Sequence, residues 1–146
     1  MLADPRLCRE GGSGGSRKTQ TLRHTMRYGS DDGGPEIPIR IGQLRARAKL
    51  DIGDDEGFTL PGVISSKLRF SGVPRVVGTG HSANNIYEVR EASFVGKLRI
   101  GPLEWVDPVV DFSDVFNNLN VGSRVLQDTT ITFDQTTKRV RLIRSR

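Results

Sequence analysis

Two short stretches of this chain recur in altered form, and this internal repeat constrains the fold more than any other feature. Residues 38–44 (PIRIGQL) are matched by residues 97–103 (KLRIGPL), and each is followed by a second run rich in apolar residues. Residues 49–53 (KLDIG) are echoed by residues 118–122 (NLNVG). Each half therefore reads as a hairpin followed by an apolar strand that ends in a glycine turn. The repeat predicts two similar β-units related by a pseudo-twofold axis.

The tips of the two units differ in chemistry. Asp51 stands at the tip of the first unit, and the echo places the amide of Asn120 at the same position in the second. Most aspartates beside a glycine only close a turn, but a turn residue has no reason to recur at the tip of a duplicated unit. If a site lies where the tips meet, the chain supplies one acid where two would form a catalytic pair.

The rest of the chain after residue 36 is also typical of β-structure, with short alternating or apolar runs separated by glycine and Asx turns. Strands are predicted at 37–41, 44–51, 73–79, 85–94, 96–100, 103–111, 129–134 and 138–144. Two helices are predicted, at 61–68, where Pro61 suits a first turn, and at 123–127. We expect an all-β domain over 37–146, folded as a small closed or partly closed barrel with two short helices.

Residues 1–36 are expected to be a disordered arm or a linker, because they hold the run GGSGGS and a basic polar stretch. They could join the domain to an upstream partner or reflect a misassigned start codon. No apolar segment typical of a secretory signal follows the start, which favours a cytoplasmic location.

Composition excludes several classes of function. No apolar run is long enough to span a membrane, since only 35% of residues are hydrophobic and 27% are charged. The single cysteine, Cys8, cannot form an intrachain disulfide, and His24 and His81 lie outside any ligand-spaced cluster, so no metal site is predicted. The net charge of +5 comes from arginines that mostly alternate with apolar residues, which is typical of a solvated strand face. A nucleic-acid-binding barrel would also need exposed stacking residues, and the chain offers few.

Four segments, in order, resemble the retropepsin-like aspartic proteases, and in particular their small bacterial single-lobe members. Residues 46–54 (ARAKLDIGD) resemble the family motif of apolar residues followed by Asp-Thr/Ser-Gly-Ala/Ser, and residues 57–61 (GFTLP) resemble the stretch that leads into the first helix. Residues 120–126 (NVGSRVL) are similar to the apolar-apolar-glycine loop and its helix. Residues 130–134 (TITFD), together with 138–142 (KRVRL), resemble the hairpin that closes a lobe.

The resemblance implies an aspartic endopeptidase with Asp51 as the catalytic residue and no cofactor. Two facing aspartates cannot both ionise cheaply, so they share one proton, and the ionised member activates a water against the peptide carbonyl. Because Asn120 occupies the second tip, the partner aspartate must come from elsewhere. The expected partners are a peptide or protein substrate and either a second copy, in a twofold homodimer, or an upstream second lobe. Neither nucleic acid nor a membrane is expected to bind.

The same resemblance predicts a flap hairpin that closes over an extended substrate, and residues 77–87 match it by position. An ordinary polar loop fits the same glycine-rich segment. The expected substrate-binding residues, on the catalytic loop and the flap, are Gly53, Asp54, Asp55, Gly78, Thr79 and Gly80.

Two residues depart from the family motif. Ile52 stands where the family has a threonine or serine whose hydroxyl fixes the two aspartate loops against each other. Asp54 stands where the family has a small residue, and Asp55 and Glu56 add to the negative charge, with Lys49 and Arg124 available to offset it. The alternative function is therefore a catalytically inactive module of the same fold that binds peptides or mediates dimerisation.

Overall fold

The structure, a computed structural model, describes residues 21–31, 34–81 and 83–145 and is built almost entirely from β-strands. The elements in chain order are β1 (Thr21–Arg27), β2 (Gly29–Asp31), β3 (Gly34–Ile41), β4 (Leu44–Asp51), β5 (Phe58–Pro61), α1 (Gly62–Ser65), β6 (Phe70–His81), β7 (Ile86–Phe94), β8 (Lys97–Ile100), β9 (Leu103–Val106), β10 (Val109–Ser113), β11 (Asn120–Gly122), the 3₁₀ turn η1 (Ser123–Leu126), β12 (Thr129–Asp134) and β13 (Arg139–Ser145). The expectation of an all-β domain is confirmed.

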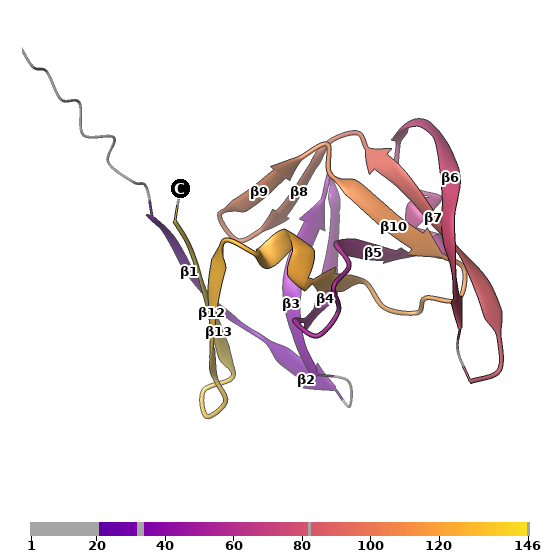
Figure 1. Ribbon diagram of the computed structural model, residues 1–146. Helices are drawn as coiled ribbons and strands as arrows, with labels where there is room; N and C mark the ends of the chain where they lie inside the picture. Colours follow the sequence, from indigo (N-terminus) through magenta and orange to yellow (C-terminus); the bar gives the residue numbers. More distant parts are fainter. Residues whose placement is uncertain (1–20, 32–33, 82, 146) are drawn as a thin grey trace, which may run out of the picture.

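The strands form two sheets. The main sheet has the order β6-β7-β10-β5-β11-β4-β3-β8-β9, with β2 paired to β3, and a smaller sheet has the order β1-β13-β12. Figure 1 shows the hairpin β6–β7 at one side of the molecule and the smaller sheet at the other. Among the described residues the main ladder ends at β6 and at β9, so the barrel is partly closed. No helix in the described part of the chain is long and apolar enough to cross a membrane.

The hairpins of the internal repeat are confirmed. Strands β3 and β4 form the first hairpin and β8 and β9 the second, and β3 also pairs with β8. Their turns begin at Gly42, with φ 59°, and at Gly101, with φ 55°. Both glycines adopt the left-handed conformation that other residues avoid, which explains why glycine recurs at this position of the repeat.

Residues 118–122 do not occupy the position in the fold that their sequence likeness to residues 49–53 suggests. Strands β4 and β11 form a parallel pair that sets Gly122 beside Asp51, while β10 and β5 form a parallel pair that sets Ser113 beside Pro61. Pro61 and Gly122 each precede a helical turn. A pseudo-twofold axis therefore exchanges β4 with β10 and β5 with β11, and Ser113 is the counterpart of Asp51. The expected equivalence of Asp51 and Asn120 is wrong, because Asn120 begins β11, the counterpart of β5.

The expected arm 1–36 is also wrong in part, because residues 21–31 and 34–36 form β1, β2 and the start of β3. Strand β1 pairs with β13 along its whole length. Met26 and Tyr28 are buried, and Tyr28 packs edge-on against Phe133 with ring centroids 5.8 Å apart. The alternation of exposed basic residues with these apolar ones is a strand signal, and the basic composition concealed it. Residues 1–20 lie outside the described residues.

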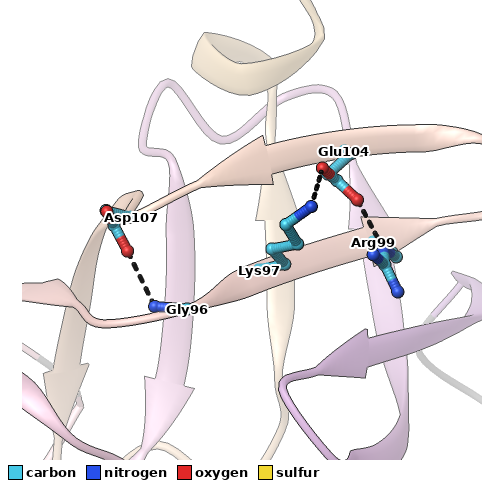
Figure 2. Close-up of polar contacts among 5 residues, drawn as sticks. All are labelled: Gly96, Lys97, Arg99, Glu104 and Asp107. Atoms are coloured by element: carbon cyan, nitrogen blue, oxygen red, sulfur yellow. Dashed lines mark hydrogen bonds and ion pairs between the residues drawn. The ribbon is translucent and has the colours of Figure 1, made fainter.

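The predicted strand 103–111 is interrupted at Asp107, whose φ of 47° turns the chain before Pro108. Figure 2 shows what holds this turn: the Asp107 carboxylate accepts a bond of 2.8 Å from the N–H of Gly96. In the same hairpin Glu104 is bound by Lys97 at 2.8 Å and by Arg99 at 2.6 Å, and these bonds lower the pKa of Glu104. The cross-strand contacts fix the register of β8 and β9.

The two predicted helices are shorter than expected, since only Gly62–Ser65 is α-helical and Ser123–Leu126 is a 3₁₀ turn. The core is formed by one face of the main sheet. Its fully buried side chains include Ile37, Ile41, Phe58, Leu60, Leu98, Ile100, Leu103, Val110 and Val121. Trp105 packs edge-on against the buried Phe58, with ring centroids 5.2 Å apart. Asp134 caps the last hairpin by accepting the N–H bonds of Thr136 and Thr137 at 3.0 Å each.

Candidate active site

Asp51 is the last residue of β4, and the chain turns immediately after it. The N–H of Gly53 donates to the Asp51 carboxylate at 3.2 Å, and the N–H of Asp54 donates to the Asp51 carbonyl at 3.2 Å. Lys49 Nζ lies 3.5 Å from the other carboxylate oxygen. The carboxylate is half-buried and stays accessible, with 35% of its side-chain surface exposed. A main-chain donor therefore orients an acid that solvent can reach.

Ile52, directly after Asp51, is 62% exposed. Together they border a hollow of about 620 Å³, which we call the Asp51 hollow. Its other lining residues are Tyr28, Gly34, Pro35, Lys49, Leu50, Phe133, Gln135 and Lys138. An exposed isoleucine at a loop tip leaves apolar surface in water that a second protein surface could cover.

A second cavity, of about 580 Å³, lies between the hairpin β6–β7 and the loops around β5 and β11, and we call it the hairpin cleft. Its lining residues are Lys49, Asp54, Glu56, Thr59, Thr79, Gly80, Tyr87, Val89, Asp111, Val115, Phe116, Asn117, Asn118 and Asn120. Lys49 lines both cavities, so they adjoin at this residue.

The floor of the hairpin cleft is a row of polar side chains that crosses adjacent strands. Asp111 of β10 pairs with Thr59 of β5, Thr59 pairs with Asn120 of β11, and Asn120 pairs with Lys49 of β4. Residues opposite each other in neighbouring strands project from the same face of a sheet. The next residues along these strands, such as Val110 and Val121, are fully buried on the opposite face. The alternation thus gives one sheet an apolar core face and a polar cleft face.

Residues 54–57, which we call the acidic loop, are held against β11 and η1. The carbonyls of Asp54, Glu56 and Gly57 accept main-chain bonds of 2.7 to 3.2 Å from residues 122–124. Asn120 Nδ2 donates to the Asp54 carboxylate at 2.6 Å, and Arg124 pairs with Glu56 at 3.0 Å. Arg124 therefore offsets part of the charge of the loop, as expected, while Lys49 contacts Asp51 instead.

Asp111 is the most perturbed acid of the described residues. It is only 6% exposed, and burial raises its pKa from 3.8 to about 6, with further contributions from the charges of Glu56 and Glu91. Arg124 acts in the opposite direction but does not cancel these effects. A carboxyl that titrates near neutrality in a cleft is a functional-site feature.

The structure distributes the predicted site residues over both cavities. Asp54, Thr79 and Gly80 line the hairpin cleft, and Asp51 lines the adjoining hollow with Gly53 bonded to it. Asp55 and Gly78 line neither cavity. The predicted flap segment 77–87 lies in the hairpin β6–β7.

Sequence reasoning missed Asp111, Glu56, Tyr87 and Phe116 as cleft residues. The available signal was the single charge of Asp111 inside the apolar run 109–112. Among the described residues no group of three His, Cys, Asp or Glu side chains is placed to hold a metal ion.

Comparison with known proteins gives a likeness of fold. No protein-family model and no curated protein sequence matches the chain. Among solved structures, the chain is similar to a retropepsin-like aspartic protease from Rickettsia conorii, with a TM-score of 0.62 and 14% sequence identity over 88% of this chain and 96% of that one. At this identity the likeness concerns the fold. The partly closed barrel, the hairpin beside a cleft and the acid at the end of β4 are therefore arranged on the retropepsin-like fold.

Proposed function

We propose that the chain is one lobe of an aspartic endopeptidase, in which Asp51 and the equivalent aspartate of a second copy or lobe form the catalytic pair. The observation that carries this proposal is the placement of Asp51 in this fold: an accessible carboxylate at the end of β4, oriented by the N–H of Gly53 at 3.2 Å. An aspartate that only closed a turn would not need an open cavity in front of it.

In this mechanism the paired aspartates hold one proton between them, because two adjacent carboxylates repel each other when both are ionised. The ionised member takes a proton from a bound water, and the protonated member donates a hydrogen bond to the scissile carbonyl. The water oxygen then bonds to the carbonyl carbon, and the aspartate that took the proton from the water passes it to the leaving nitrogen as the C–N bond breaks. No metal or cofactor takes part in these steps.

The second aspartate has to come from another polypeptide surface or lobe. Ser113, the counterpart of Asp51 by strand pairing, carries no acid. The exposed Ile52 beside Asp51 supplies apolar surface at the place where a twofold axis would bring two copies together. A homodimer satisfies both requirements with one contact.

The hairpin β6–β7 serves as the flap in this proposal. Thr79 and Gly80 of β6 and Tyr87 of β7 line one wall of the hairpin cleft. An extended peptide lying in the cleft would pass beneath this hairpin and reach Lys49, where the Asp51 hollow begins. Gly53, Asp54, Thr79 and Gly80 would then contact the substrate.

A second candidate, an inactive peptide-binding or dimerisation module, is favoured by a different observation. Lys49 Nζ lies 3.5 Å from Asp51, as a structural ion pair would place it, and Ile52 lacks the hydroxyl of the family motif. In this candidate the hairpin cleft and the dimer contact remain, but the protein does not cleave peptides.

One experiment separates the two functions. The purified full chain is examined by sedimentation equilibrium and by cleavage of a mixed peptide pool from about pH 4 to 7, the range of a carboxyl pair. We expect a dimer that cleaves peptides and is blocked by a statine-type transition-state mimic. Asp51→Asn should lower cleavage by at least about 10³-fold, whereas the control Asp128→Asn, an exposed acid outside both cavities, should not. A dimer that binds peptides without cleaving them would establish the module instead.

A further inference from the structure

Asp111 differs from the other acids around the hairpin cleft in its contacts. Glu91 of β7, which lies opposite Asp111 of β10, forms an ion pair with Arg75 at 2.7 Å. Glu56 pairs with Arg124 at 3.0 Å, and Asp54 accepts a bond from an amide. Among the described residues no ion pair within 4.0 Å joins Asp111 to a cation, and burial together with the charge of Glu56 raises its pKa.

A buried acid that lies in the field of other acids and has no ion pair of its own favours a positive charge beside it. Only 6% of the surface of Asp111 is exposed, yet Asp111 lines the hairpin cleft. Once Asp111 is ionised, the charges of Glu56 and Glu91 disfavour its own charge, and Arg124 offsets this effect only in part.

We propose that the hairpin cleft binds the side chain of a lysine or arginine of a peptide, with the carboxylates of Asp111 and Glu56 as its acceptors. The proposal deepens the function proposed above, because it rests on a peptide lying in this cleft. The ammonium or guanidinium group supplies the positive charge that no described residue provides to Asp111 as an ion pair.

The charge of the lining agrees with a cationic occupant. Three carboxylates, those of Asp54, Glu56 and Asp111, face the cavity, against the single cation Lys49. Lys49 already lies beside Asp51 at 3.5 Å. Hydrogen bonds between a charged donor and a carboxylate are the strong ones in proteins.

The walls agree with the apolar stem of such a side chain. Tyr87 and Phe116 form an edge-to-face pair, with ring centroids 5.5 Å apart, and both line the cavity together with Val89. Lysine and arginine bury their methylene chains against apolar surface while the charged end reaches polar groups. Aromatic faces also attract the cation itself. The volume of about 580 Å³ admits such a side chain with part of the peptide that carries it.

The preference of the cleft for peptides that carry lysine or arginine should increase as pH rises from about 5 to about 7.5. The reason is that burial and the charges of Glu56 and Glu91 raise the pKa of Asp111 to about 6. Arg124, which pairs with Glu56, opposes this shift, and Lys49 and Asp54 also line the cavity. Below the transition Asp111 keeps its proton and holds a cation less strongly.

The test measures binding, not cleavage, so that it is independent of Asp51 chemistry. Four fluorescent peptide pools share a neutral random background and differ in one fixed residue: lysine, arginine, glutamine or glutamate. Anisotropy titrations of the full chain at pH 7.5 should show the lysine or arginine pool binding about tenfold more tightly than the glutamine pool. In Asp111→Asn this ratio should fall to about twofold or less, while the control Asp128→Asn, which removes the same charge outside the cleft, should keep it.

Each outcome decides the proposal. Equal binding of the four pools, no binding of any pool, or an unchanged preference in Asp111→Asn with native circular dichroism would overturn it. A preference for basic peptides without any cleavage would contradict the endopeptidase proposal and support the cation site. Cleavage that is lost in Asp51→Asn but shows no preference for basic residues would support the endopeptidase and contradict the cation site.

Discussion

Replacing Asp111 with asparagine should stabilise the protein, and the gain should grow with pH. Asparagine keeps the shape of the side chain but cannot ionise. An acid whose folded-state pKa is raised contributes its stability below the unfolded pKa and loses it as pH rises through the folded pKa. For Asp111 the two values are 3.8 and about 6, so the loss falls between about pH 4 and 6.

The magnitude follows from that difference. At about 1.36 kcal/mol per pH unit, the ionised wild-type side chain costs about 3 kcal/mol at pH 7.5 and about 1 kcal/mol at pH 4.5. The free energy of unfolding of Asp111→Asn, measured relative to wild type, should therefore rise by about 2 kcal/mol between these pH values. Any pH-independent effect of the amide cancels in this comparison.

Urea unfolding followed by circular dichroism at pH 4.5, 5.5, 6.5 and 7.5, at constant ionic strength, measures the difference. Thr59→Val is the matched control, because Thr59 is the buried neighbour of Asp111 in the strand row and does not titrate. Its difference from wild type should stay constant with pH. A difference for Asp111→Asn that is flat with pH, or that falls as pH rises, would refute the account of a destabilising buried carboxylate.

Three further substitutions test the site and its support. Gly80→Ala should weaken peptide binding by about tenfold, because the added methyl would overlap the Tyr87 ring in the cleft, while Gly78→Ala, with nothing within 4 Å, should bind as wild type. Equal affinities of the two variants would show that this wall does not shape the cleft. Gly122→Ala should destabilise the protein by about 3 kcal/mol in thermal or urea unfolding, since its methyl would meet main-chain carbonyls of the acidic loop. Ile52→Thr should weaken dimerisation in sedimentation experiments by about tenfold, because it removes apolar surface that the proposed twofold contact covers; an unchanged dimer would place this residue away from the axis.

The fold class and the loop that follows Asp51 were predictable because their signals are local. Alternating residues, the glycines at 42 and 101 in the left-handed conformation, and an aspartate followed by a glycine each act within a few residues of chain. The same kind of signal was present in β1, where Met26 and Tyr28 alternate with basic residues. It was overlooked because a glycine-rich, basic neighbourhood resembles a linker.

The cleft depended on contacts that no local pattern specifies. Asp111, Thr59, Asn120 and Lys49 are far apart in sequence and become neighbours only when four strands pair in one register. The equivalence of the two half-repeats failed for the same reason, since a resemblance of five residues does not determine which strand pairs with which.

The sequence by itself determined that this chain forms β-hairpins, where they turn and which acid ends β4, because turn geometry and side-chain alternation are properties of neighbouring residues. Only the tertiary structure decided that Ser113 is the counterpart of Asp51, and that Asp111 is an acid buried beside Glu56 in a cleft. Strand order and burial arise from the packing of the whole chain, and the perturbed pKa of Asp111 arises from them.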